Sequence, residues 1–164
     1  MADVKTPEQR SRNMAAIKGK DTKPEIIVRK YLFFRGLRFR VQARKLPGTP
    51  DIVLPKYNTA IFVNGCFWHG HEGCKYFRLP KSNVEFWKEK IERNVARDRE
   101  TMQALLDLGC QVIRVWECEL RNKANREGTL NKIYNSITSS DGSAYSFEET
   151  DVPIAAEPEA DYSR

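Results

Sequence analysis

The sequence predicts one α/β domain, in which helices flank a central sheet. Short, continuous apolar runs at 51–54, 60–63 and 112–116 are typical of strands buried on both faces. Amphipathic patterns at 22–34 and 82–108 are typical of helices. A chain of 164 residues, of which 40% are hydrophobic, can bury one core of this kind.

The first helix is predicted to begin at a capping box formed by Thr22 and Glu25, with Pro24 in the first turn, where a missing N–H costs nothing. Gly36 is expected to end this helix. Its buried face is expected to hold three residues: Ile27, Tyr31 and Phe34.

The remaining elements follow in order. Residues 37–42 alternate between basic and apolar, as in a strand, and residues 64–80 are irregular. A second capping box is expected at 82–85. The long helix that follows is expected to end at Gly109, and a last helix near Thr138.

Charge is distributed unevenly along the chain. The first 50 residues carry 13 Lys and Arg against 4 Asp and Glu, whereas residues 139–164 carry 7 acidic residues against one arginine. A basic body suggests a polyanionic partner, most often nucleic acid, although solubility alone is the alternative. We therefore expect a basic, DNA-binding arm at 1–20, a compact domain at 21–138 and an acidic tail at 139–164 that is disordered.

The sequence also indicates a compartment. No apolar run reaches the roughly 18 residues of a membrane helix, and the first 20 residues lack the apolar segment of a secretory signal. We expect a cytoplasmic protein with no membrane partner. Its four cysteines are then thiols or metal ligands rather than disulfides.

Three soft metal ligands, Cys66, His71 and Cys74, lie within nine residues. A structural zinc ion takes four nitrogen or sulfur ligands, and Cys118 follows a strand that can end beside this loop. We expect these four residues to bind Zn²⁺; the alternative is four scattered small hydrophobic residues. Cys110 is expected to be an ordinary buried thiol.

The same loop holds a second histidine and two aromatic residues. His69 is not needed for zinc and is free for catalysis. Phe67 and Trp68 are flanked by glycines rather than placed in a periodic core segment. Two interpretations stay open: they stack on or wedge between bases, or they pack over the zinc loop.

Three carboxylates are candidates for chemistry on phosphate. Asp51 begins a buried strand, where many nucleases hold Mg²⁺, although Pro-Asp is also a common turn. Glu25 has a sufficient role in its capping box and reaches a metal only if its helix faces Asp51. Asp98 falls within the apolar stripe of the long helix and therefore needs a partner. That partner is either His69, which Asp98 would orient as a general base, or a neighbouring arginine.

Several motifs together resemble the very short patch repair endonucleases, bacterial enzymes that nick DNA at T:G mismatches. The resemblance spans residues 8–122. The motifs are Arg-Asn-Met at 12–14, Asp-Thr at 21–22 with Glu25, Leu-Pro-Gly-x-Pro-Asp at 46–51, Gly-Cys-Phe-Trp-His at 65–69, Glu-Phe-Trp at 85–87, Asn-Val-x-Arg-Asp-Arg at 94–99 and Val-Trp-Glu-Cys at 115–118.

The resemblance implies a restriction-endonuclease-like fold, with a central mixed sheet flanked by helices and a structural zinc site. It implies Mg²⁺-dependent hydrolysis of one DNA strand, 5′ to the T of a T:G mismatch, in the repair of deaminated 5-methylcytosine. The partners would be double-stranded DNA carrying that mismatch and other mismatch-repair proteins. The enzyme would be a monomer that acts on the bacterial nucleoid.

Matching positions imply roles for the catalytic residues. Asp51 and the backbone carbonyl of Val63 would bind Mg²⁺, and Glu25 would support the waters of that ion. His69 would be the general base, oriented by Asp98. Asn64 stands where the family usually has a histidine that contacts the phosphate; asparagine can donate a hydrogen bond but carries no charge.

The resemblance also implies contacts with DNA. The aromatic wedge beside the mismatch would consist of Phe67, Trp68 and Trp87. The basic arm would close over the minor groove with Arg12, Asn13 and Met14. Two other functions fit these residues: a DNA mismatch-binding protein without turnover, which Asn64 would favour, and a nuclease of the same fold with a different specificity.

Overall fold

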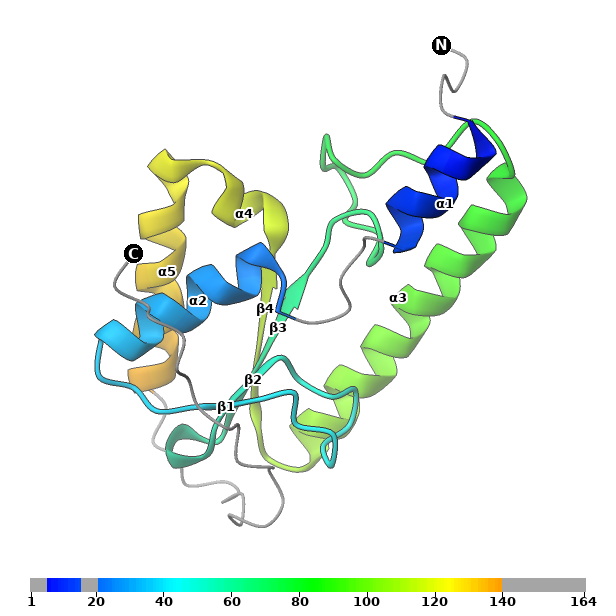
Figure 1. The fold of residues 1–164 in the computed structure, drawn as a ribbon. Coiled ribbons are helices and arrows are strands. Elements are labelled where there is room, and N and C mark those ends of the chain that lie inside the picture. The colour runs from blue at the N-terminus through cyan, green and yellow to red at the C-terminus, as the bar shows by residue number, and fades with distance from the viewer. Residues whose placement is uncertain (1–5, 16–20, 140–164) are drawn as a thin grey trace.

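A computed structural model describes residues 6–15 and 21–139 (Figure 1). Its elements, in chain order, are α1 (Pro7–Ala15), α2 (Lys23–Phe34), β1 (Arg40–Val41), β2 (Ile52–Leu54), the 3₁₀ helix η1 (Pro55–Tyr57), β3 (Thr59–Asn64), α3 (Val84–Asp107), β4 (Gln111–Trp116), α4 (Glu117–Arg121) and α5 (Lys123–Thr138). Among the described helices, none has the length and apolar character needed to cross a membrane.

The four strands form one mixed sheet in the order β1-β2-β3-β4. The pairs β1/β2 and β2/β3 are antiparallel, and Ile52 lies opposite Ile61 in the β2/β3 hairpin. β3 and β4 are parallel, and Asn64 lies opposite Trp116 at their ends. A parallel pair needs a long crossover, which α3 supplies. The predicted mixed α/β sheet flanked by helices is therefore confirmed.

Helices cover both faces of this sheet (Figure 1). Alternate residues of β2 and β3 point to opposite faces, as the pleat requires. Ile52 and Ile61 join one core with buried residues of α2, α4 and α5. Val53 and Ala60 join the other core with Leu105 of α3. Burial on both faces explains why these strands are continuous apolar runs in the sequence.

The predicted apolar face of α2 is only partly correct, because Ile27 and Tyr31 are partly buried against the core but do not form its centre. The buried residues of this helix are Glu25, Val28, Arg29 and Leu32, whereas Phe34 is 64% exposed. These four positions have the i, i+3, i+4, i+7 spacing of a core-facing stripe. The apolar pattern misled the prediction because two of the four core positions carry charged residues.

The two predicted capping boxes are also not formed as expected. Thr22 is the N-cap of α2, but its Oγ1 donates to Glu25 Oε1 at 3.1 Å and caps no backbone N–H. Glu25 reaches back instead to the Asp21 backbone N–H, 3.0 Å from Oε2. α3 follows Asn83, whose left-handed φ of 55° turns the chain into the helix one residue after the expected Ser82 cap.

Two further boundaries differ from expectation. The strand predicted at 37–42 is reduced to Arg40–Val41, because Gln42 adopts a left-handed φ of 52°. The last helix is split at Asn122, whose side chain accepts a hydrogen bond from the Ala124 N–H at 2.9 Å. The basic arm is described only at α1, and nearly all of the predicted acidic tail lies outside the described residues.

Candidate active site and metal centre

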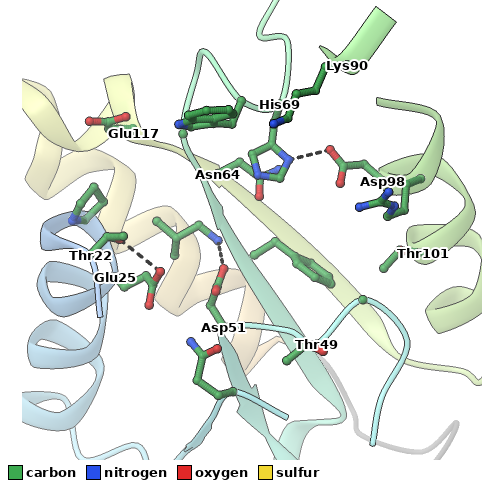
Figure 2. Close-up of a pocket in the computed structure, with 18 residues that line it drawn as sticks. Thr22, Glu25, Thr49, Asp51, Asn64, His69, Lys90, Asp98, Thr101 and Glu117 are labelled. Atoms are coloured by element: carbon green, nitrogen blue, oxygen red, sulfur yellow. Dashed lines mark hydrogen bonds and ion pairs between the residues drawn. The ribbon is translucent and has the colours of Figure 1, made fainter. Parts of the chain in front are cut away.

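A cavity of about 890 Å³ opens between the start of α2, the end of β3 and α3 (Figure 2). Residues from four segments far apart in the sequence line it. The five predicted catalytic residues are all among them: Glu25, Asp51, Asn64, His69 and Asp98. We call this cavity the pocket.

Asp51 immediately precedes β2, the first strand of the β2/β3 hairpin. Its Oδ2 accepts a hydrogen bond from the Val63 backbone N–H at 2.8 Å, which fixes the carboxylate against β3. Burial raises the pKa of Asp51 above its ordinary value, against the opposing effects of the Val63 N–H and the Arg29 charge. The Asp51 carboxylate has therefore lost part of its hydration, and a bound cation would offset the free-energy cost of that loss.

Glu25 lies in the first turn of α2 and is only 3% exposed. Burial, and then the charge of Asp51, raise the pKa of Glu25 to about 7, whereas Arg29 and the Thr22 hydroxyl oppose the rise. The start of α2 therefore faces Asp51, which is what a role for Glu25 beside a metal requires. Both acids line the pocket.

His69 and Asp98 form a hydrogen-bonded pair across the pocket. His69 Nδ1 lies 2.7 Å from Asp98 Oδ2, and the side chains are 32% and 24% exposed (Figure 2). Of the two partners left open by the sequence, the structure brings His69 to Asp98. Because the carboxylate occupies Nδ1, the other ring nitrogen, Nε2, is left to act as an acceptor.

Two glycines let two loops approach α3 closely: Gly70 follows His69, and Gly48 lies in the loop before Asp51. Gly70 has a φ of +61°, and a Cβ there would lie 2.9 Å from Ile91 Cγ2. Gly48 has a φ of +72°, and a Cβ there would lie 2.1 Å from Thr101 Cγ2. A side chain at either position would push its loop away from α3.

Asn64 ends β3 and is buried. Of the predicted DNA contacts, Trp68 also lines the pocket. Arg12 is exposed on α1 and is not among the residues that line the pocket. The side chains of Asn13 and Met14 lie outside the described part of the chain.

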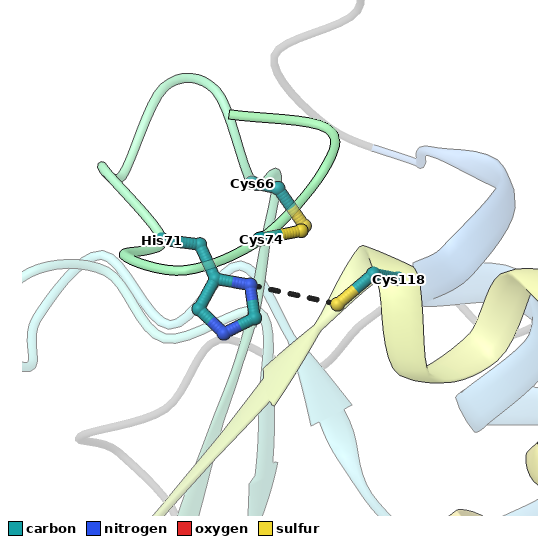
Figure 3. A group of neighbouring side chains, drawn as sticks. All are labelled: Cys66, His71, Cys74 and Cys118. Atoms are coloured by element: carbon teal, nitrogen blue, oxygen red, sulfur yellow. Dashed lines mark hydrogen bonds between the residues drawn. The ribbon is translucent and has the colours of Figure 1, made fainter. Parts of the chain in front are cut away.

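The four predicted zinc ligands gather at one place, where the loop after β3 meets the start of α4 (Figure 3). The ligand atoms of Cys66, His71, Cys74 and Cys118 all lie within 4.8 Å of one another. His71 Nδ1 faces Cys118 Sγ at 3.5 Å, and its ring stacks on Trp116 with centroids 4.0 Å apart.

The donor set of this cluster fits a soft, tetrahedral cation. Three thiols and one imidazole are typical ligands of structural zinc. Burial and the neighbouring Cys66 thiol raise the pKa of Cys118 to about 12, so a nearby cation is needed to hold all three sulfurs as thiolates. Cys110 lies apart in the α3-side core, as expected of an ordinary buried thiol.

The aromatic residues form a second cluster. The ring centroids of Phe67, Trp68 and Trp87 lie 5.1–5.8 Å apart in edge-to-face contacts. Phe86, which is 53% exposed, extends the group at 5.2 Å from Trp87, and the Lys90 ammonium lies 5.5 Å from the Trp68 ring centroid. The three rings are half-buried, so both interpretations from the sequence stay open.

Several residues near the pocket were not predicted. Lys90, Arg97 and Gln42 line it, and Arg29 lies behind Glu25. Gln42 has a strained φ of 52°, and its Nε2 is buried with no hydrogen-bond partner among the described residues. Only Arg29 had a signal in the sequence, namely the i, i+4 spacing from Glu25.

Comparison with known proteins identifies a family. The family model described as DNA mismatch endonuclease Vsr matches residues 2–75. The chain is 48% identical over 137 residues to the type II nicking enzyme V.NmeAIP of Neisseria meningitidis, an alignment that covers 84% of this chain and 97% of that protein. It is 48% identical over 123 residues to the DNA mismatch endonuclease Vsr of Escherichia coli, covering 75% and 78%. The chain therefore belongs to the DNA mismatch endonuclease Vsr family, a family of DNA endonucleases, which are hydrolases.

Proposed function

We propose that this protein nicks one strand of duplex DNA 5′ to the T of a T:G mismatch, in a Mg²⁺-dependent reaction that begins very short patch repair of deaminated 5-methylcytosine. The observation that carries the proposal is the single pocket that unites Asp51, Glu25 and the His69–Asp98 pair. A metal-binding acid and a positioned base facing one cavity are the parts needed for phosphodiester hydrolysis. Membership of the Vsr family supports the choice of substrate.

The acids of the pocket fit a hard divalent cation. Glu25 is buried and Asp51 is half-buried; both carboxylates have raised pKa values, and oxygen ligands are those that Mg²⁺ prefers. The N–H of Val63 points to Asp51, and the N–H and C=O of a strand residue point to the same edge. We assign Asp51 and the Val63 carbonyl to Mg²⁺, which would supply charge neutralisation at the scissile phosphate.

The remaining roles belong to side chains of the protein. His69 Nε2 takes the proton of the attacking water, while Asp98 holds the imidazole by Nδ1. Glu25 orients solvent beside Asp51, and Asn64 donates a hydrogen bond to the phosphate. Because Asn64 is neutral, the phosphate is held with less charge than a protonated histidine would supply.

The zinc site and the fold hold the catalytic residues in place. Zn²⁺ held by Cys66, His71, Cys74 and Cys118 would tie the loop that carries His69 to the start of α4. The sheet, an antiparallel hairpin followed by a parallel crossover strand with Asp51 at the hairpin, supports a restriction-endonuclease-like arrangement.

DNA contacts complete the proposal. We assign the cluster of Phe67, Trp68 and Trp87 to the wedge beside the mismatch, since aromatic rings inserted between base steps open the stack. The segment 1–20, with Arg12, Asn13 and Met14, acts as the arm that closes on the DNA.

A nicking assay tests this function. End-labelled duplexes that differ only in one T:G, T:A or other mismatched pair are incubated with the protein and Mg²⁺ or EDTA, and the cut is mapped on both strands. We expect a single cut, 5′ to the T of the T:G pair, only with Mg²⁺. Equal cutting of all duplexes would indicate a nuclease of different specificity, and T:G binding without any cut would indicate a non-catalytic binding protein.

A further inference from the structure

The inner face of α2 carries two buried charges where a core-facing helix normally carries apolar side chains. Glu25 and Arg29 alternate there with Val28 and Leu32, and Arg29 is only 4% exposed. Arg29 does not line the pocket. Its guanidinium contacts Asp21 and Glu25, and its charge also acts on Asp51.

The guanidinium of Arg29 fixes the Glu25 carboxylate. Arg29 Nη2 donates to Glu25 Oε2 at 2.9 Å, and Nη1 donates to Asp21 Oδ1 at 2.6 Å. Glu25 Oε2 also accepts from the Asp21 N–H, and Oε1 accepts from the Thr22 hydroxyl. Both carboxylate oxygens are therefore held from the protein side, so the acid is fixed in orientation where it faces Asp51.

Stability alone does not explain this arrangement. A buried ion pair is rarely more stabilising than apolar side chains of similar size, because both charges lose their hydration. Around Arg29 the charges are unequal: Asp21, Glu25 and Asp51 are three acids against one guanidinium. With all four groups ionised, the excess is two negative charges, which one divalent cation neutralises.

We propose that Arg29 is a positioning residue of the nicking reaction, which holds the Glu25 carboxylate toward Asp51 and itself touches neither the DNA nor the metal. This inference rests on the proposed function, because it gives Glu25 a task beside the metal. It predicts that Arg29 acts mainly through Glu25, because its guanidinium contacts that carboxylate, whereas it reaches Asp51 by charge alone.

A double-mutant cycle tests that prediction. Arg29→Met, Glu25→Gln and the double variant are compared with the wild type in single-turnover nicking of a T:G duplex across Mg²⁺ concentrations. Arg29→Met should slow nicking by about 10–100-fold, as removal of an outer-shell partner of a metal site does. Arg29→Lys, which keeps the charge but loses the fork, should recover part of the rate. The double variant should be no more than about threefold slower than Glu25→Gln.

Controls separate this role from folding and from the proposed function. Arg126, half-buried on α5 and bonded to the Leu120 carbonyl at 2.7 Å, is a matched arginine outside the pocket, so Arg126→Met should nick at the wild-type rate. In denaturant titrations without Mg²⁺, the double variant should shift the unfolding midpoint by less than the sum of the shifts caused by Arg29→Met and Glu25→Gln. If Arg29→Met does not fold, Arg29→Lys in both Glu25 backgrounds gives the same comparison.

The outcomes are distinct. If the wild-type protein does not cut the T:G duplex, the proposed function is contradicted. The double-mutant cycle is then measured on another duplex that the wild type cuts. If the wild type cuts no duplex, the cycle is measured by denaturant unfolding. The role assigned to Arg29 is overturned if substituting it leaves the nicking rate unchanged. It is also overturned if the substitution slows the Glu25→Gln variant by the same factor as it slows the wild type. Additivity of the two midpoint shifts overturns it as well.

Discussion

At the scale of single residues, the pocket consists of acids and one imidazole whose positions are set by neighbours that the sequence alone does not reveal. The loop that carries His69 packs closely on α3 at Gly70, and His69 Nδ1 lies 2.7 Å from Asp98 Oδ2 on that helix. The assignment of His69 as a general base makes the most specific kinetic prediction at this scale.

Replacing His69 by alanine should slow single-turnover nicking by about 10²–10⁴-fold, the usual contribution of a positioned base. The rise of rate with pH that a base confers should disappear in this variant. Asp98→Asn should cost less, because it keeps a hydrogen-bonding group beside Nδ1. Asp107→Asn, on the exposed side of α3, is the matched control and should keep the wild-type rate. A His69→Ala profile that overlays the wild type would remove the base from the mechanism.

Glu25 makes a prediction about stability and pH. Its folded-state pKa is raised from 4.5 to about 7, so the folded protein holds this proton more tightly than the unfolded chain does. As pH rises from about 4.5 to 7 the unfolded chain loses the proton first, and the free energy of unfolding should fall by about 3 kcal/mol at most. Glu25→Gln should lack this fall in Mg²⁺-free denaturant titrations. Parallel pH curves for the two proteins would show that Glu25 is not the group responsible.

The sequence predicted which residues form the site better than it predicted the distances between them. Cys66, His71, Cys74 and Cys118 were assigned from spacing, and the structure gathers them within 4.8 Å. Arg29 was missed because the apolar residues Ile27 and Tyr31 suggested a different inner face. A charged residue on a core face cannot be recognised from periodicity, since periodicity places it on the solvent side.

At the scale of elements, the loop between β3 and α3 carries three of the four metal ligands, Cys66, His71 and Cys74, and two of the three clustered rings, Phe67 and Trp68. This loop is irregular, as the sequence predicted, so side-chain contacts must hold it in place. The buried strands were predicted closely because two apolar faces leave a continuous signal. The start of α2 was predicted correctly at Thr22, whereas α3 begins one residue later than expected, because Asn83 adopts a left-handed backbone conformation that no spacing rule reports.

If zinc holds the loop, removing one ligand should destabilise the whole domain. Cys118→Ala should lose zinc and several kcal/mol of unfolding free energy, because metal binding supplies about 10–16 kcal/mol in comparable sites. Metal analysis and thermal unfolding measure both effects. Cys110→Ala is the matched control, because Cys110 lies outside the cluster, and it should retain about one zinc per chain. Wild-type protein that is fully stable without zinc would contradict this role.

The aromatic cluster makes a prediction that distinguishes its two interpretations. Unstacking a base step costs a few kcal/mol, and a wedge offsets that cost only where the pair is weak. Trp68→Ala should therefore weaken binding to T:G duplex more than binding to matched duplex, with little change in salt dependence. Phe34→Ala removes an exposed aromatic ring on α2 and should leave both affinities unchanged. Equal losses on both duplexes would mean that Trp68 packs the loop and reads no mismatch.

At the scale of the whole molecule, the sheet serves to bring four distant segments to one cavity. The hairpin presents Asp51, α2 presents Glu25, and the crossover helix presents Asp98 to His69 (Figure 2). The mixed sheet and its flanking helices could be predicted from apolar patterning, because they depend on burial alone. The distances across the pocket could not, because they depend on contacts between segments more than 25 residues apart.

The charge pattern of the whole chain is consistent with a DNA-binding enzyme. Without residues 139–164 the chain carries 27 Lys and Arg against 15 Asp and Glu. Such an excess favours association with a polyanion and makes affinity fall as salt rises. The pocket itself is the exception, since its acids would repel phosphate unless a cation lies between them.

The central claim, that Asp51 holds the metal of a mismatch-nicking site, is tested most directly by Asp51→Asn. Binding to a T:G duplex and single-turnover nicking of it are measured side by side, with Mg²⁺, for this variant and the wild type. We predict that Asp51→Asn binds the duplex within about threefold of the wild type, because the aromatic rings, Asn64 and the basic segment that we assign to the DNA are unchanged, and that it no longer nicks, because the charge that holds Mg²⁺ is lost. Nicking by Asp51→Asn at the wild-type rate and Mg²⁺ concentration would contradict the claim and place the metal outside this pocket.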